Sequence, residues 1–173
     1  CCNTVIGSYA GQNAASLLEN TLVGYQAARG GANCSIVIGA CAGHAYGGFH
    51  NAIIGNCALH GGTSSSRDTV AIGYGAAKCT GHACCSIAIG TGALQNKTTS
   101  KKNSAIGYFA NATLSQACDD DAIGYQALNV NASVSGCNTA IGSSALSDHV
   151  NSCQQTAIGA RAMMFGTTGR QNT

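Results

Sequence analysis

The chain has 173 residues, of which 24 are Gly and 29 are Ala, with no Pro, no Trp and only 8% charged side chains. That composition excludes a disordered segment, which would be richer in charge and Pro, and the net charge of +2 supplies no basic patch for nucleic acid. No run approaches the roughly 18 apolar residues of a membrane span. The chain begins without an initiator Met or a signal peptide, so we expect Cys1 not to be the natural first residue.

A single repeat runs through the whole chain. The dipeptide Ile-Gly, once Val-Gly, recurs ten times, and successive glycines lie 15 to 18 residues apart. We number each of these glycines as position 0. With this numbering, the residue at position +3 is Ala in every repeat. The glycines are Gly7, Gly24, Gly39, Gly55, Gly73, Gly90, Gly107, Gly124, Gly142 and Gly159. Because the array starts and stops within a repeat, we expect residues 1–173 to be a single repeat array, cut from a longer repetitive protein.

Each repeat predicts one β-strand, over positions −4 to +1. The period is too short for two helices and a turn, and a Gly at a fixed point disfavours a helix. Side chains alternate along a strand, so positions −1 and +3 share one face and positions −2 and 0 share the other. Both faces are apolar or bare, which is typical of a strand covered on both sides. We therefore predict an all-β fold, a parallel β-solenoid or flat β-roll of about ten coils with 15–18 residues per coil.

Two columns of like residues are expected to form the core, because residues at one position of adjacent coils stack along the axis. The column at position −1 is Ile6, Val23, Ile38, Ile54, Ile72, Ile89, Ile106, Ile123, Ile141 and Ile158. The column at position +3 is Ala10, Ala27, Ala42, Ala58, Ala76, Ala93, Ala110, Ala127, Ala145 and Ala162. At position −4, Asn recurs at Asn3, Asn20, Asn51, Asn103 and Asn138, and we expect these amides to bond along the axis.

Two stretches of the repeat resemble known families. The unit Asn-Thr-Ala-Ile-Gly-x-x-Ala at residues 138–145 resembles the head repeats of trimeric autotransporter adhesins. Ala-Ile-Gly-Tyr-Gln-Ala-Leu at residues 122–128 is similar to repeats of some phage and large-virus tail-fibre-like proteins. The resemblance covers all ten repeats. It implies a homo-oligomer, trimeric in the adhesin family, at a cell surface or virion surface.

The eleven Cys residues predict disulfides and an oxidising, extracellular surrounding. Like positions of adjacent coils lie about 4.8 Å apart, within the Cα range that a disulfide accepts. The alternative is that several are small buried thiols. The disulfide candidates are Cys41, Cys57, Cys79, Cys84, Cys85, Cys118, Cys137 and Cys153. Because the number of Cys is odd, a link between chains is also expected, and Cys1 and Cys2 are its candidates.

No metal and no cofactor are expected, with one alternative. Cys41-x-x-His44 and Cys57-x-x-His60 occupy the same positions of consecutive coils and could together offer a zinc-type ligand set. Asn-x-Ser/Thr sequons in or beside the variable turns make the protein a candidate glycoprotein. The sequons begin at Asn33, Asn96, Asn111 and Asn131.

The sequence does not predict an enzyme. It has only six carboxylates, three of them in the run Asp119 to Asp121, and its His residues are scattered over variable turns. We expect a structural subunit of an extracellular or virion-associated filament that is built by stacking β-solenoid coils, is stabilised by disulfides and associates with copies of itself. The alternative is the receptor- or glycan-binding head of a trimeric adhesin or tail fibre, with glycans or a cell-surface receptor as partner. Neither hypothesis involves nucleic acid or a membrane span.

Overall fold

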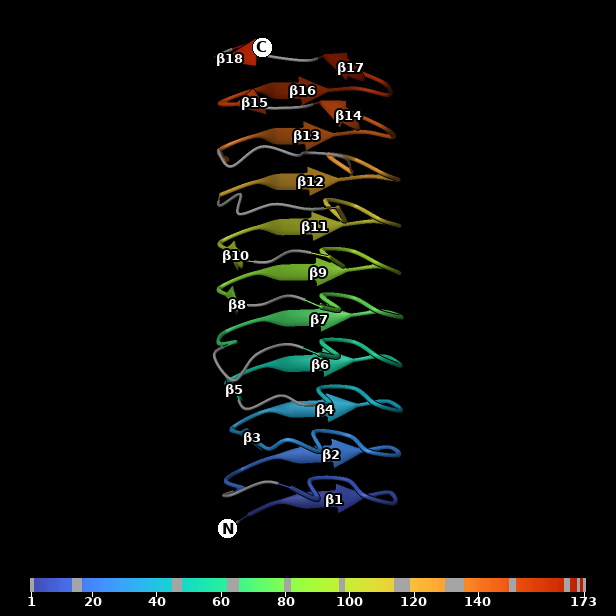
Figure 1. Ribbon diagram of the computed structural model, residues 1–173, viewed down its shortest axis with the longest axis vertical. Coiled ribbons are helices and arrows are strands. Elements are labelled where there is room, and N and C mark those ends of the chain that lie inside the picture. Colours follow the sequence, from blue (N-terminus) through green and yellow to red (C-terminus); the bar gives the residue numbers. More distant parts are fainter. Residues whose placement is uncertain are drawn as a thin grey trace.

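The computed structural model of the protein is a stack of β-coils without a helix among the residues that it describes. Those residues are 2–13, 17–44, 48–61, 66–79, 82–96, 99–113, 119–129, 136–149, 152–166, 169–170 and 172. Figure 1 shows the strands one above another, with the two chain ends at opposite ends of the stack. The predicted fold class, an all-β parallel β-solenoid, is confirmed. In these segments no helix is long and apolar enough to cross a membrane.

One strand from each repeat joins a ten-stranded parallel sheet that runs the length of the stack. Its register keeps like positions side by side, so that Ala105 pairs with Ala88 and Ala122 on the neighbouring coils. Each repeat therefore forms one coil. The strands are β1 (Thr4–Ile6), β2 (Thr21–Val23), β4 (Ile36–Ile38), β6 (Ala52–Ile54), β7 (Val70–Ile72), β9 (Ile87–Ile89), β11 (Ser104–Ile106), β12 (Asp121–Ile123), β13 (Thr139–Ile141) and β16 (Thr156–Ile158).

Short strands in the returning half of several coils form four further parallel pairs among the described residues. These pairs give part of the array a second, shorter strand in each coil. The pairs are β3 (Ala32–Asn33) with β5 (Gly48–Phe49), β8 (His82–Cys84) with β10 (Thr99–Lys101), β14 (Asp148–His149) with β17 (Phe165–Gly166), and β15 (Ser152–Cys153) with β18 (Gly169–Arg170).

The strands of the main sheet span only positions −3 to −1, because the Gly at position 0 leaves the extended conformation. Gly124, which follows β12, has a φ of 138°, a conformation that residues with a Cβ rarely adopt. A Cβ on Gly124 would lie 2.5 Å from the carbonyl oxygen of Gly142 on the next coil. Gln126 and Leu128 then adopt a positive φ of 53° and complete a tight turn. Both the turn and the close approach of the coils thus require Gly at this position.

Small side chains fill the core between the main sheet and the returning half of each coil. Ala105 at position −2 and Ala110 at position +3 are fully buried. The rest of the column at position +3 agrees with the predicted inward orientation, with Ala10 and Ala162 of the end coils partly buried. Leu59 and Leu94 at position +4 supply the larger apolar side chains.

The column at position −1 faces outward, and its prediction as core is wrong. Ile106 is 38% exposed, whereas Ala105 beside it is fully buried. The prediction assumes that side chains continue to alternate between the two faces beyond position 0, which would place positions −1 and +3 on one face. The positive φ of the Gly breaks that alternation, and positions −2 and +3 face inward together instead. Large exposed members of the column are Ile6, Ile38, Ile54, Ile106, Ile123, Ile141 and Ile158, and the partly exposed ones are Val23, Ile72 and Ile89.

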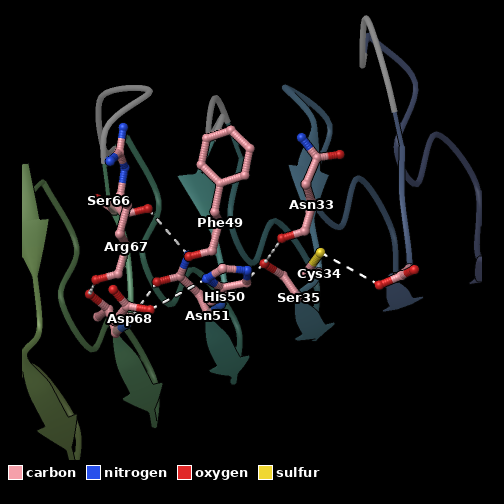
Figure 2. A network of polar contacts seen from close by, with 11 residues as sticks. Asn33, Cys34, Ser35, Phe49, His50, Asn51, Ser66, Arg67 and Asp68 are labelled. Atoms are coloured by element: carbon pink, nitrogen blue, oxygen red, sulfur yellow. Dashed lines mark hydrogen bonds and ion pairs between the residues drawn. The ribbon is translucent and has the colours of Figure 1, made fainter.

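A column of polar side chains lies at position −4, where each coil turns into its strand, and all of its members except the exposed Asn3 of the first coil are buried. The backbone N–H of Asn138 donates to Oδ1 of Asp120 (3.1 Å), and the N–H of Gln155 donates to Oδ1 of Asn138 (3.2 Å). Ser35 and Asn51 of this column lie on neighbouring coils in Figure 2, with the Asn51 N–H donating to the Ser35 hydroxyl (3.2 Å). The prediction that the Asn residues at position −4 bond along the axis is confirmed. The polar column is Asn3, Asn20, Ser35, Asn51, Thr69, Ser86, Asn103, Asp120, Asn138 and Gln155.

Candidate functional site

The outward side of the ten-stranded sheet is one candidate site, because it exposes apolar side chains from end to end. We call it the apolar face and define it by positions −1 and −3 of all ten coils. Ile36 and Ile87 at position −3 are 47% and 39% exposed, and they add to the outward column at position −1. All of these positions belong to the described residues. Position −3 is Thr, Ser or Asp in six of the ten coils, and Asp121 is the one charged residue of the face. A surface of this kind is typical of an interaction site.

Tyrosines extend the apolar face at the turn that follows it. Tyr108 and Tyr125 occupy position +1 of neighbouring coils, and their rings stack with centroids 5.4 Å apart and planes 4° apart. Both side chains are about half exposed. Stacked aromatic rings present a large apolar surface together with a hydroxyl that reaches water.

A second candidate site is a row of basic residues at position +5 of four successive coils, which we call the basic column. It consists of Arg29, His44, His60 and Lys78. Backbone hydrogen bonds hold the coils in register there, because the N–H of Gly61 donates to the carbonyl of His44 (3.1 Å) and the N–H of Cys79 to that of His60 (2.9 Å). The imidazole rings of His44 and His60 stack with centroids 5.0 Å apart and planes 13° apart.

The surroundings of the basic column disfavour further positive charge. Burial lowers the pKa of His60 below its usual value of 6.5, and the nearby His44 and Lys78 lower that pKa further. A hollow of about 290 Å³ is lined by Asn13, Arg29, Gly30 and His44. Nε of Arg29 is buried beside it, and within the described residues no hydrogen-bond acceptor reaches that nitrogen.

The net charge conceals the basic column, which is why composition does not predict it. The column becomes visible in the sequence when the repeats are aligned on their glycines, because four successive repeats then carry Arg, His, His and Lys at position +5. The relevant quantity is the charge of one column rather than the charge of the chain.

The edge that precedes the strands carries a different set of contacts, shown in Figure 2. Nδ1 of His50 lies 3.5 Å from Oδ1 of Asp68, and the Arg67 guanidinium lies 5.7 Å from the centre of the Phe49 ring. The side chains of His50 and Asp68 are both more than half exposed. Exposed pairs of this kind contribute little to stability.

The disulfide predictions gain no support from the structure. No disulfide is seen among the nine described cysteines, and Cys1 and Cys118 lie outside the described residues. The register of the coils explains why most of these cysteines are not paired, because the nearest neighbours of a side chain are the residues in the same column of adjacent coils. Those neighbours of Cys84 are Arg67 and Lys101. The described candidates without a disulfide are Cys41, Cys57, Cys79, Cys84, Cys85, Cys137 and Cys153, and Cys2 is exposed and also without a disulfide.

The four possible zinc ligands do not form a metal site. The rings of His44 and His60 stack on each other, while Cys41 Sγ lies 3.7 Å from Oε1 of Gln26. Among the described residues, no three His, Cys, Asp or Glu side chains are grouped so that they could hold a metal ion.

One of the four predicted glycosylation sites is wrong. Asn111 is fully buried at position +4, where other coils place Leu or Ala in the core, so its amide is inaccessible in the folded protein. Asn96 is exposed and Asn33 is partly exposed, and both stay predictions. Asn131 lies outside the described residues.

Comparisons with protein-family models, with curated proteins and with solved structures find no match to this chain.

Proposed function

We propose that the protein is a structural subunit of an extracellular or virion-associated filament built by stacking β-solenoid coils, in which copies associate through their apolar faces with an axial stagger, so that each copy contacts two others. The observation that carries the proposal is the outward column at position −1. Ile54, Ile106 and Ile141 are each more than one-third exposed and lie in line along the sheet. Leaving such a column in water is unfavourable, and its burial against another apolar surface would stabilise an assembly.

The size and chemistry of the apolar face support a second copy of the chain as its partner. Ten strands about 4.8 Å apart make the face roughly 43 Å long, and three residues at about 3.3 Å make it roughly 10 Å wide. Two such faces would bury about 860 Å² together, which lies in the range of weak interfaces. Asp121 is its one charge, so a charged partner would find little to bind, whereas a second apolar face is complementary.

The extracellular or virion-surface location rests on the resemblance of the repeats to adhesin heads and tail-fibre-like proteins. Those families use elongated stacks of similar units outside the cell or on the virion. The alternative function, a receptor- or glycan-binding head, is favoured by one different observation, the basic column.

Sedimentation velocity and electron microscopy of the native protein over a range of concentrations test the filament proposal. The variant Ile106→Lys/Ile141→Lys places two charges on the apolar face. The control Asn96→Lys/Gln154→Lys places the same two charges on exposed positions away from that face. We expect the wild type and the control to form elongated assemblies and the apolar-face variant to remain monomeric, with circular dichroism showing that all three are folded.

A wild-type protein that stays monomeric at every concentration would refute the proposal. Equal assembly by the apolar-face variant would show instead that another surface joins the copies.

A further inference from the structure

The basic column lacks counter-charges. Within the described part of the chain, the single ion pair joins His50 to Asp68 on the edge that precedes the strands. The charged groups that influence the pKa of His60 are His44 and Lys78, and no carboxylate is among them. Five of the six carboxylates lie at positions −5 to −3 and one at position +6 of a distant coil: Glu19, Asp68, Asp119, Asp120, Asp121 and Asp148.

Arg29 and Lys78 are charged at neutral pH, and a proton on His60 between them is repelled by its basic neighbours unless an anion lies close by. Adjacent coils are about 4.8 Å apart, and like charges placed directly opposite on neighbouring strands are unfavourable. Because the fold holds the column in register through backbone hydrogen bonds at His44 and His60, the side chains cannot separate by a shift of the coils. A ligand with negative charges would turn this repulsion into attraction.

The N-terminal part of the basic column also offers a place for an anionic group. The hollow beside Arg29 and His44 is lined in addition by Asn13 and Gly30, which supply polar groups without negative charge. Nε of Arg29 is a buried donor to which no described residue supplies an acceptor. A guanidinium with a free donor pairs well with the oxygens of a sulfate or a carboxylate.

We propose that the basic column binds a linear acidic glycan, with its sulfate or carboxylate groups following Arg29, His44, His60 and Lys78 from coil to coil. The column is straight and spans three coil intervals, roughly 14 Å, and an extended acidic polysaccharide repeats its anionic groups sugar by sugar along a line. Nucleic acid fits less well, because single strands stack their bases on aromatic side chains. Described positions +4 to +6 of these four coils carry no Phe, Tyr or Trp.

This site shares no residue with the apolar face, so it does not depend on the filament proposal. The pH dependence of binding follows from the groups around His60. These are His44 and Lys78, with the thiol residues Cys57 and Cys79 hydrogen-bonded to the His60 backbone. An anion on the column favours the protonated form of His60, so we expect binding to strengthen as the pH falls from about 7.5 to about 5.5.

Isothermal titration calorimetry with a heparin octasaccharide tests the proposal at low ionic strength. The variant Arg29→Gln/Lys78→Gln removes two charges from the column, and Lys101→Gln/Lys102→Gln removes two exposed charges from the opposite edge. We expect the column variant to bind roughly tenfold more weakly than the wild type, and the control to bind within about twofold of it. In His44→Gln/His60→Gln, we expect affinity to lose most of its pH dependence.

The titrations also separate the possible ligands. Absence of heat with the octasaccharide, or equal weakening in the column variant and the control, would overturn the proposal. A single-stranded oligodeoxynucleotide that binds as tightly as the octasaccharide, or inorganic sulfate that binds equally well, would overturn the assignment to a linear glycan. Tight binding of the octasaccharide together with weak binding of both other probes would support it. Circular dichroism of each variant distinguishes loss of a ligand contact from loss of the fold.

Discussion

Ala105 and Ile106 are neighbours in β11 and point to opposite sides of the sheet, with Ala105 fully buried and Ile106 38% exposed. Ala105→Asp places an unpaired carboxylate in the core and is expected to lower the free energy of unfolding by at least about 3 kcal/mol. Ile106→Asp faces solvent and is expected to cost about 1 kcal/mol. Chemical denaturation of dilute protein, where copies do not associate, measures both. An equal loss in the two variants would contradict the outward orientation of position −1.

Asn111 is a polar residue in an apolar column, between Leu94 and Leu128 at position +4. It is fully buried, and within the described residues neither its Nδ2 nor its Oδ1 has a hydrogen-bond partner. Asn111→Leu removes those unsatisfied groups, and Leu94 and Leu128 already adopt the same positive φ. We expect this substitution to raise the free energy of unfolding by about 1 to 3 kcal/mol. Thermal denaturation measures the change, and a lower melting temperature would show that the amide is satisfied in solution.

The stability of the protein is expected to depend on pH through His60. Burial and the positive charges of His44 and Lys78 lower the pKa of His60 in the folded state below 6.5. The folded state therefore binds fewer protons than the unfolded state, and stability rises with pH across this range. The contribution is present above about pH 6.5 and is lost as the pH falls through the lower, folded-state pKa. His60→Gln should flatten this part of the profile in urea denaturation at a series of pH values, and an unchanged slope would exclude His60 as its source.

Cys41 and Cys57 are the described cysteines that share a column on adjacent coils, both at position +2. Their backbones are one coil apart, within the range that a disulfide spans. We expect oxidation to join them and to raise the free energy of unfolding by up to about 3 kcal/mol, because the closed loop is about 15 residues long. Peptide mapping without reduction identifies the bond, and Cys57→Ser is the control. Detection of two free thiols after full oxidation would contradict this prediction.

The sequence predicts the coil and its period well, because Gly at position 0 and Ala at position +3 recur without exception. It also predicts the hydrogen-bonded Asn residues of the polar column, since stacked amides bond along an axis. The orientation of Ile106 is not predicted correctly, because the positive φ of Gly107 interrupts the alternation on which the inference rests. The sequon at Asn111 fails for a related reason, since a three-residue motif carries no information on burial.

The disulfide candidates and the basic column show that the number of residues between two positions does not predict which side chains are neighbours. Cys84 is a disulfide candidate in the sequence, but in the structure its neighbours are Arg67 and Lys101. Likewise, Arg29 and Lys78 are far apart in the sequence and belong to one row of the surface. In a stacked fold, a side chain contacts the residues at the same position of the adjacent coils, whatever their separation in the sequence.

The close approach of the glycines at position 0 makes each coil an interchangeable module. Because Gly124 leaves no room for a Cβ against Gly142, and the same spacing recurs along the stack, successive coils keep one separation. Deleting the 17 residues from Ser104 to Asp120 would join Asn103 to Asp121 and leave the order of positions intact. The molecule would then be shorter by one strand spacing, about 4.8 Å. The length of the molecule is therefore a whole number of coils. Duplication or loss of one such repeat changes the length by one strand spacing and keeps the positions that form the apolar face and the basic column in line.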